Sequence, residues 1–409
     1  MSDSDTTAAD RAILLQVTEA GLLHLPAQEL FGGFCEAVVA AGIPLLRSQM
    51  SLAMVHPGLR GYSMTWRRGI GVDAFEGFEH ASQAAPAWYR SPGAYMLNNL
   101  VTHLHARLEG PERPDPWFEL YDDLLAIGVT DYHGVAHPFG WASTADRTNN
   151  LGELGMFASW STDRRGGFGA DWDRLEALVR VLALAFKGRT LGDMAENLMS
   201  TYLGRDAGLR VLHGEVHRGD IRTIDASILL CDLRGFTAMA DRTPKDVLLP
   251  LLDTYMEAIC APVDAHGGQV LKFLGDGVLA IFADDDRDTG DKAARALAAA
   301  TDIRARVAAI NADRSALSRP VMPLDIALHE GDVVYGNVGA TGRMDFTVIG
   351  PAVNEAARME ARCGELGVDI LLSDAFVAGL PDRTAVVALG NHSLRGVSRP
   401  RALFTLAGS

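Results

Sequence analysis

The sequence predicts an α+β protein in which two mixed domains are connected by one long helix. The chain has 409 residues, which is too long for one ordinary core, so two domains are expected. Patterns typical of strands alternate with patterns typical of helices in both halves of the chain. Between these halves, apolar residues recur at helical spacing from Trp172 to Tyr202.

The first half combines helices and strands. Residues 1–10 are polar and acidic, and we expect them to be disordered. Gly42 and Pro44 end the second of two helical stretches, and Gly58 and Gly61 mark a turn between two strand-like stretches. The expected elements are helices at 14–23 and 29–41, strands at 51–57 and 62–68, a helix at 117–127 and a strand at 156–162.

Histidine and aromatic side chains in this half raise the question of a cofactor. His103 with His105, or His133 with His137, could ligate haem or a metal, but no Cys or Glu partner lies at a suitable spacing. We therefore expect surface or ordinarily hydrogen-bonded histidines. We also expect the large aromatic residues in the core rather than around a chromophore, namely Trp66, Trp88, Tyr89, Trp141 and Trp160.

The long helix follows the loop sequence RRGGFG, and Gly204 ends it. Its length and its position between two mixed blocks favour a connector that pairs with its copy in a second chain. The alternative is a helix that packs on the first domain without a regulatory role.

The second half, from about residue 222, carries more signals. Residues 228–231 form a short apolar run typical of a buried strand, so Asp232 is expected at a strand end, and Gly235 frees the backbone beside it. Thr243 and Pro244 are a typical helix start. The expected elements are strands at 226–232, 269–282 (two arms around the turn 274–277), 323–331, 346–350, 369–372, 384–389 and 401–406, and helices from 243, at 293–310 and at 353–366.

Several residue types in this half suit phosphate and metal chemistry. Asp232 and Asp276 lie on two tips that are adjacent if their strands pair, and two carboxylates with substrate phosphates suit Mg²⁺. Lys272 lies in an otherwise apolar strand, where it either points into a cleft or reaches the surface along its alkyl chain. Asn354 and Arg358 are four residues apart and share one helix face.

Three segments together resemble one family closely. CDLRGFT, KFLGDGVLAIF and FTVIGPAVNEAARMEA are similar, in order and spacing, to the class III nucleotidyl cyclases, adenylate and guanylate. The resemblance covers residues 225–406. It implies a ferredoxin-like catalytic domain at 221–409 that uses two Mg²⁺ or Mn²⁺ ions per site. It also implies a head-to-tail homodimer, because in this family the metal carboxylates and the Asn/Arg pair serve one site from opposite subunits.

The resemblance assigns a role to each matching residue. Asp232, the Leu233 backbone and Asp276 would hold the metal ions. Asn354 would orient the ribose, and Arg358 would stabilise charge at the α-phosphate. A further cation for the triphosphate would be Arg395 or Arg399, of which neither aligns securely. The phosphate loop would be formed by the backbone of Leu233, Arg234, Gly235, Phe236 and Thr237.

Two positions would read the base. A Lys ammonium donates to the acceptor N1 of adenine, whereas guanine requires an acceptor such as a carboxylate. Lys272 occupies the base-reading position and Thr347 its partner, whereas guanylate cyclases typically have Glu and Cys there. The pair therefore implies an adenylate cyclase with ATP as substrate, although many family members have Asp where this chain has Thr347.

The N-terminal half loosely resembles a GAF-type sensory domain, with a PAS-like or unclassified α/β sensor as the alternative. The expected organisation is a disordered terminus at 1–10, a sensor for an unknown small molecule at 11–165, a connecting helix and linker at 166–220, and the catalytic domain at 221–409.

Composition limits the partners and the compartment. The net charge of −15 argues against nucleic acid and anionic membranes as partners. No apolar run reaches the roughly 18 residues of a membrane span, and the N-terminus lacks the order of a signal peptide. The four cysteines are far apart, and we expect buried thiols. The sequence thus predicts a soluble, cytoplasmic protein.

Two alternatives to an adenylate cyclase remain open. One is a cyclase that acts on GTP or another nucleotide. The other is a catalytically silent, nucleotide-binding homologue, although Asp232, Asp276, Asn354 and Arg358 are all present.

Overall fold

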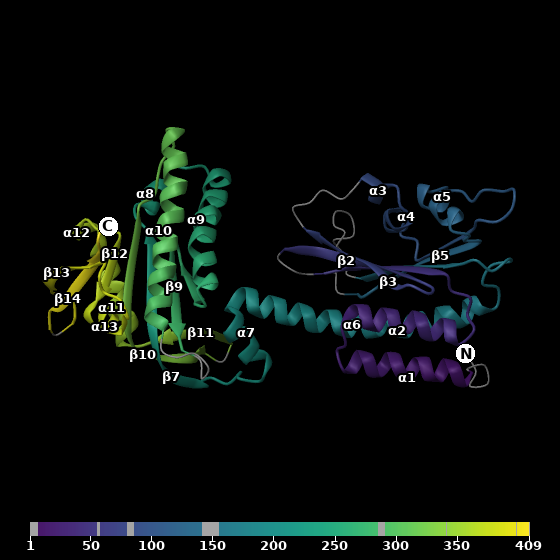
Figure 1. Ribbon diagram of the computed structural model, residues 1–409, viewed down its shortest axis with the longest axis horizontal. Coiled ribbons are helices and arrows are strands. Elements are labelled where there is room, and N and C mark those ends of the chain that lie inside the picture. Colours follow the sequence, from purple (N-terminus) through teal and green to yellow (C-terminus); the bar gives the residue numbers. More distant parts are fainter. Residues whose placement is uncertain are drawn as a thin grey trace. The chain divides into compact units, whose positions relative to one another are not determined.

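The computed structural model describes residues 7–54, 58–79, 86–140, 155–284, 291–340, 342–397 and 399–408. The chain forms two compact units, Met1–Leu198 and Met199–Ser409 (Figure 1). The boundary falls inside the long helix α6 (Asp171–Leu203). Helix α6 is continuous over the stretch from Trp172 to Tyr202 in which the sequence predicts a helix.

The N-terminal unit is built on a six-stranded sheet in which every pair of neighbouring strands is antiparallel, in the order β3-β2-β1-β6-β5-β4. Its strands are β1 (Arg47–Ala53), β2 (Leu59–Arg67), β3 (Gly71–Glu79), β4 (His103–Arg107), β5 (Asp131–Pro138) and β6 (Gly155–Thr162). Its other helices are α1 (Ala8–Leu22), α2 (Ala27–Ala40), α3 (Pro86–Tyr89), α4 (Pro92–Asn99) and α5 (Glu119–Ala126).

Helices cover both faces of this sheet. On one face, α1, α2 and the first half of α6 pack on apolar side chains of β1, β2 and β6, such as Met50, Trp66 and Trp160 (Figure 1). On the other face, α5 packs on β4 and β5 through Tyr121 and Tyr132. Because helices cover both faces, side chains on both faces of β5 and β6 are buried over part of their length.

Helix α6 changes character along its length. Its first half is buried against the sheet through Leu175, Leu182 and Phe186. In the second half, Leu191 is 46% exposed and Tyr202 is 82% exposed. The first half therefore belongs to the N-terminal core, as the alternative interpretation expected, whereas the apolar residues of the second half lack that cover.

Several details of this unit differ from the sequence prediction. Helix α1 begins at Ala8, where Thr7 caps it in a capping box, so residues 8–10 are helical rather than disordered. Trp66 and Trp160 are buried as predicted, but Tyr89 is exposed and Trp88 only half-buried. Trp141 and residues 55–57 lie outside the described residues.

The C-terminal unit is built on a mixed sheet in the order β13-β14-β12-β10-β7-β9-β8, with β11 paired to β10. Among the strand pairs that the described residues form in this sheet, β10 and β12 are parallel and the others are antiparallel. Its strands are β7 (Ile221–Leu233), β8 (Gln269–Leu274), β9 (Gly277–Ala283), β10 (Leu324–Ala340), β11 (Arg343–Ile349), β12 (Ile370–Ser373), β13 (Val386–His392) and β14 (Arg401–Leu406). Its helices are α7 (Arg205–Leu212), α8 (Phe236–Ala240), α9 (Lys245–Ala265), α10 (Lys292–Ala316), α11 (Pro351–Glu360), α12 (Cys363–Leu366) and α13 (Asp374–Gly379).

Strand β7 lies in the middle of this sheet and is buried on both faces. Helices α9 and α10 cover one face (Figure 1), where Leu229 and Cys231 point. Helix α11 and strand β11 contribute to the opposite cluster, which contains Ile228 and Leu230. A strand buried on both faces is apolar at every position, which explains the continuous run in the sequence.

Two further expectations can be checked in the fold. Cys35, Cys231 and Cys363 are buried thiols and Cys260 is partly buried, and all four are unpaired, which confirms the prediction. Among the helices that the described residues form, none combines the length and the apolar character that crossing a membrane requires.

Candidate active site

The two candidate metal carboxylates meet at one end of strand β7. Asp232 is the second-last residue of β7, and Asp276 lies in the turn between β8 and β9. Strand β9 pairs with β7, and Cys231 lies opposite Val278, which brings that turn to the end of β7. A Cβ atom at Gly277 would come within 3.0 Å of Asp232 Oδ1, so this glycine leaves room for the carboxylate beside Asp276.

Asp325 and Glu360 add two more carboxylates to this end of the sheet. We call Asp232, Asp276, Asp325 and Glu360 together the acidic cluster. Asp325 lies opposite Asp232 on β10, and Glu360 ends α11. Burial, followed by the charges of Asp276 and Asp325, raises the pKa of Asp232 to about 6. Burial, followed by the charges of Asp232 and Asp325, raises the pKa of Glu360 to about 7. Carboxylates that repel one another in this way favour a bound cation.

Arg234 offsets part of this charge. Its Nε donates to Asp325 Oδ2 over 3.0 Å, and its Nη2 contacts Asp325 Oδ1. The guanidinium is thus held by β10, and the Arg234 backbone N–H donates to the Pro323 carbonyl over 2.9 Å. Gly235 has a φ of +83° and precedes α8, whose first N–H groups lack helical partners.

Lys272 on β8 reaches across to β11. Its Nζ forms an ion pair with Asp345, and both side chains are nearly half exposed. Thr347 lies two residues after Asp345 and therefore on the same face of β11, opposite the buried Phe346 and Val348. Sequence reasoning missed Asp345, although its spacing from Thr347 was the available signal.

Asn354 and Arg358 lie on the side of α11 that turns away from its own sheet. Ala352 and Ala356 bury the other side of the helix, whereas Asn354 is exposed and Arg358 half-buried. A Cβ atom at Gly396 would lie 3.4 Å from Arg358 Nη2, so the turn at Gly396 packs against this guanidinium.

The candidate residues form separate groups within one chain. Asp232, Asp276 and Glu360 interact electrostatically. Across the residues that the structure describes, no hydrogen bond or ion pair joins Asn354 or Arg358 to that group. The two candidate triphosphate cations, Arg395 and Arg399, are both exposed.

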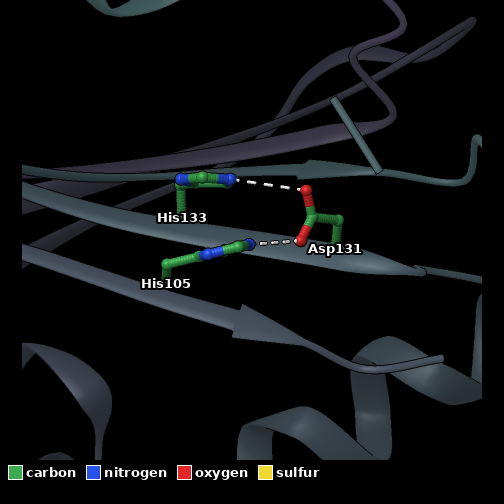
Figure 2. Close-up of side chains that lie close together, drawn as sticks. All are labelled: His105, Asp131 and His133. Atoms are coloured by element: carbon green, nitrogen blue, oxygen red, sulfur yellow. Dashed lines mark hydrogen bonds and ion pairs between the residues drawn. The ribbon is translucent and has the colours of Figure 1, made fainter. Parts of the chain in front are cut away.

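A second group of ionisable side chains, in the N-terminal unit, was missed in the sequence. Asp131 and His133 share one face of β5, and His105 lies opposite His133 on β4 (Figure 2). The sequence interpretation considered only Cys and Glu as partners for the histidines, whereas the partner is an aspartate. His-x-His on one strand and Asp-x-His on the next were the signal. His103 pairs with His133, and His105 with Asp131, whereas the Nε2 of His137 is buried without a hydrogen-bond partner among the described residues.

Comparisons with known proteins identify the C-terminal unit. Residues 221–406 match the family described as the adenylate and guanylate cyclase catalytic domain. These residues therefore form a class III adenylate/guanylate cyclase catalytic domain, from a family that uses divalent metal ions.

Two curated proteins and one solved structure are similar to part of the chain. The chain is 33% identical over 162 residues to an adenylate cyclase of Anabaena cylindrica, a match that covers 40% of this chain and 32% of the relative. It is 29% identical over 185 residues to adenylate cyclase 1 of Rhizobium meliloti, covering 45% and 28%. The crystal structure of the adenylyl cyclase CyaB from P. aeruginosa matches at 25% identity and a TM-score of 0.43, covering 46% of this chain and 96% of that one. The chain thus spans about a third of the length of these curated relatives.

Proposed function

We propose that this protein is an adenylate cyclase that converts ATP into 3′,5′-cyclic AMP and pyrophosphate. The observation that carries the proposal is the acidic cluster inside a cyclase catalytic domain. The side chain of Arg234 donates to Asp325 and to the Val368 carbonyl, and the pKa values of Asp232, Asp276 and Glu360 remain raised. Hard oxygen donors of this kind fit Mg²⁺ or Mn²⁺ together with substrate phosphates.

The roles follow from the chemistry of each group. Asp232, Asp276 and the Leu233 backbone would hold two divalent ions, which would lower the pKa of the ribose 3′-hydroxyl and neutralise the triphosphate. Within the loop Leu233–Thr237, the N–H groups of Gly235, Phe236 and Thr237 would face the phosphates, because Gly235 turns the backbone into the start of α8, whereas the Arg234 N–H donates to the Pro323 carbonyl. Asn354 would orient the ribose and Arg358 would stabilise charge that builds at the α-phosphate.

A homodimer with composite sites is part of the proposal. Asn354 and Arg358 face away from the sheet of their own chain, which supports their delivery to the site of a second chain. Of the two candidate triphosphate cations, Arg395 is favoured, because it adjoins Gly396, which packs on Arg358.

Adenine is proposed as the base on the evidence of Lys272, whose ammonium can donate to adenine N1. The test is to incubate the pure protein with ATP, GTP, CTP and UTP in turn, with Mg²⁺ or Mn²⁺, and to identify the cyclic products by mass spectrometry. We expect cyclic AMP from ATP as the main product. No cyclic product with any nucleotide would favour the silent homologue instead.

One observation favours a second candidate, a cyclase that also accepts GTP. Asp345 lies beside Lys272 and supplies the acceptor that guanine N1–H and the N2 amine require. Asp345→Asn removes this charge with little change of shape. A fall in GTP use with unchanged ATP use would support guanine reading by Asp345; equal effects on both would assign Asp345 to holding Lys272 only.

The N-terminal unit is proposed as a GAF-like sensor for a ligand that regulates the cyclase. A sheet covered by helices on both faces supports this proposal. So does its connection to the catalytic domain through α6, whose first half is part of the sensor core.

A further inference from the structure

His105, Asp131 and His133 form a compact cluster of potential metal ligands in the N-terminal unit, which we call the histidine–aspartate cluster. His105 Nε2 lies 2.8 Å from Asp131 Oδ1, and His133 Nε2 lies 3.3 Å from Asp131 Oδ2. Each histidine thus points at a different oxygen of one carboxylate (Figure 2). The ligand atoms of all three residues lie within 4.8 Å of one another.

The strands place these residues together by register. His105 and His133 are directly opposed on β4 and β5, and their rings stack with centroids 4.2 Å apart. Asp131 precedes His133 by two residues, which puts it on the same face of β5. The geometry is therefore fixed by a sheet and not by mobile side chains alone.

Surrounding groups hold the two buried members in place. The Phe168 N–H donates to Asp131 Oδ2 over 3.1 Å. A Cβ atom at Gly167 would overlap the Asp131 carboxylate, so the loop RRGGFG closes over it only with glycine at this position. His133 lies between His105 and Trp172, whose ring centroid is 3.7 Å away.

His103 contacts the other ring nitrogen of His133. Its Nε2 lies 3.0 Å from His133 Nδ1. A histidine that ligates a metal through Nε2 carries its proton on Nδ1 and needs an acceptor there, and His103 is placed to accept that proton in a hydrogen bond.

The Asp131 carboxylate is well supplied with hydrogen-bond donors. Burial alone would raise the pKa of Asp131, but hydrogen bonds from His105, His133 and the Phe168 N–H outweigh it and hold this pKa well below its usual range.

We propose that His105, Asp131 and His133 bind a divalent first-row transition ion such as Zn²⁺, with a position left open for solvent or a further ligand. Two imidazoles and one carboxylate favour such ions over Mg²⁺ or Ca²⁺. Tetrahedral bonds of about 2.1 Å bring ligand atoms to about 3.4 Å from one another. His105 can supply the adjustment, because its side chain is 46% exposed, whereas Asp131 and His133 are only 2% and 6% exposed.

This site has a direct contact with the connecting helix. Trp172, the second residue of α6, stacks on both His133 and His103. Phe168, in the loop before α6, donates to Asp131 and packs its ring edge-on against His133. A bound ion would therefore fix the start of α6 against strands β4 and β5.

The test is zinc binding by the full chain in excess Mg²⁺, with bound zinc counted by elemental analysis after gel filtration. We expect one tightly bound ion per chain. His105→Ala should weaken zinc binding at least about tenfold, since replacing even a residue that hydrogen-bonds to a metal ligand lowers the affinity for the metal by that much. Because the His105 side chain is 46% exposed, we expect His105→Ala to fold normally, and circular dichroism of this variant checks that it does.

Two matched controls locate the ion. His24→Ala removes a histidine that pairs with the single carboxylate of Asp193, and should leave zinc binding unchanged. Asp276→Asn alters the acidic cluster and should leave it unchanged as well. In addition, bound Co²⁺ should quench the fluorescence of Trp172. Trp172→Phe should remove this contribution to the quenching while Co²⁺ still binds.

Absence of tight zinc binding by the unaltered chain would overturn the proposal, as would unchanged binding in His105→Ala. The three side chains would then be a hydrogen-bonded structural cluster. Because the measurement is of bound metal and not of nucleotide turnover, its result is independent of the proposed cyclase activity.

Discussion

The two units of this protein each place an aspartate in a cluster of ionisable groups, and they do so in opposite ways. In the acidic cluster, Asp232 faces other carboxylates, and its pKa is raised to about 6 by burial and by Asp276 and Asp325. In the histidine–aspartate cluster, Asp131 receives hydrogen bonds from two histidines and a backbone N–H, and its pKa is held well below the usual range.

This difference shows how the same side chain can be prepared for different ligands. Carboxylates that raise one another's pKa values favour a bound cation, so under the proposed function divalent ions and substrate phosphates would complete the acidic cluster. Asp131 already has donors for both oxygens, and a metal would bind there only by replacing protons on the imidazoles. The first cluster suits exchange of substrate with each turnover, and the second suits retention of one ion.

The largest effect is expected from the carboxylates of the acidic cluster. Asp232→Ala and Asp276→Ala should each lower cyclase turnover by far more than tenfold, a loss above about 1.4 kcal/mol of transition-state stabilisation, because each removes a metal ligand. The control is Asp225→Asn, which changes an exposed carboxylate on the same strand that pairs with Lys292. Cyclic AMP production at saturating Mg²⁺ is the measurement. Retention of more than about a tenth of the activity in either alanine variant would contradict the metal assignment.

Mixed dimers test whether the acidic cluster works with the helix face of another chain. Chains with Asp232→Ala and chains with Arg358→Ala should each be inactive alone. Mixed in equal amounts, they should regain about a quarter of the unaltered activity, since half of the dimers are mixed and each of these has one intact site. Verified heterodimers without activity would exclude sites composed from two chains.

Two of the four carboxylates in the acidic cluster could be predicted from the sequence, and the other two could not. Asp232 and Asp276 follow apolar runs whose pairing could be inferred, because a two-residue turn connects β8 and β9. Asp325 joins them through the register of β7 with β10, nearly a hundred residues apart in the chain. Glu360 joins through the packing of α11. Neither relation leaves a local pattern.

The N-terminal unit was harder to predict. Strand β3 has five consecutive exposed residues, so it lacks the alternation by which strands are recognised. Strand β5 contains aspartate, glycine and two histidines, and its Asp131 and His133 are buried because they pair with each other and, through Asp131, with His105 on β4. Long periodic elements such as α6 were predicted closely, since apolar residues recur along them at helical spacing.

A smaller effect is expected in the pH dependence of stability. The pKa of Glu360 is raised to about 7 in the folded chain, from 4.5, so the folded state binds its proton more tightly than the unfolded state does. Its contribution to stability is therefore lost as the pH rises from about 4.5 to about 7. Glu360→Gln should lose less stability between pH 5 and pH 8 than the unaltered chain, and added Mg²⁺ should reduce the difference.

The two units can be followed separately in this experiment. All six tryptophans lie between Trp66 and Trp172, so tryptophan fluorescence reports on the N-terminal unit, and circular dichroism on both. Urea unfolding measured by circular dichroism should show the Glu360 effect, and fluorescence should not. If the stability of both proteins, followed by circular dichroism, depended on pH in the same way, the pKa of Glu360 would not be raised in the folded chain.

The smallest effect is expected in α6, which extends from the N-terminal core into the C-terminal unit. Its first half is fixed by Leu175, Leu182 and Phe186, whereas Leu191 and Tyr202 in the second half are exposed. If the second half pairs with its copy, its rotational phase matters. Two residues inserted between Phe186 and Leu191 rotate the downstream stripe by about 200°, whereas seven residues restore the phase to within about 20°.

We expect the two-residue insertion to change basal cyclase activity several-fold and the seven-residue insertion to change it much less, although the latter lengthens the helix more. Both insertions leave Leu175, Leu182 and Phe186 in place, so fluorescence-detected unfolding should match that of the unaltered chain. Equal activity in the two insertions would show that the phase of α6 carries no signal. The helix would then be a spacer whose exposed residues, Leu191 and Tyr202, need another explanation.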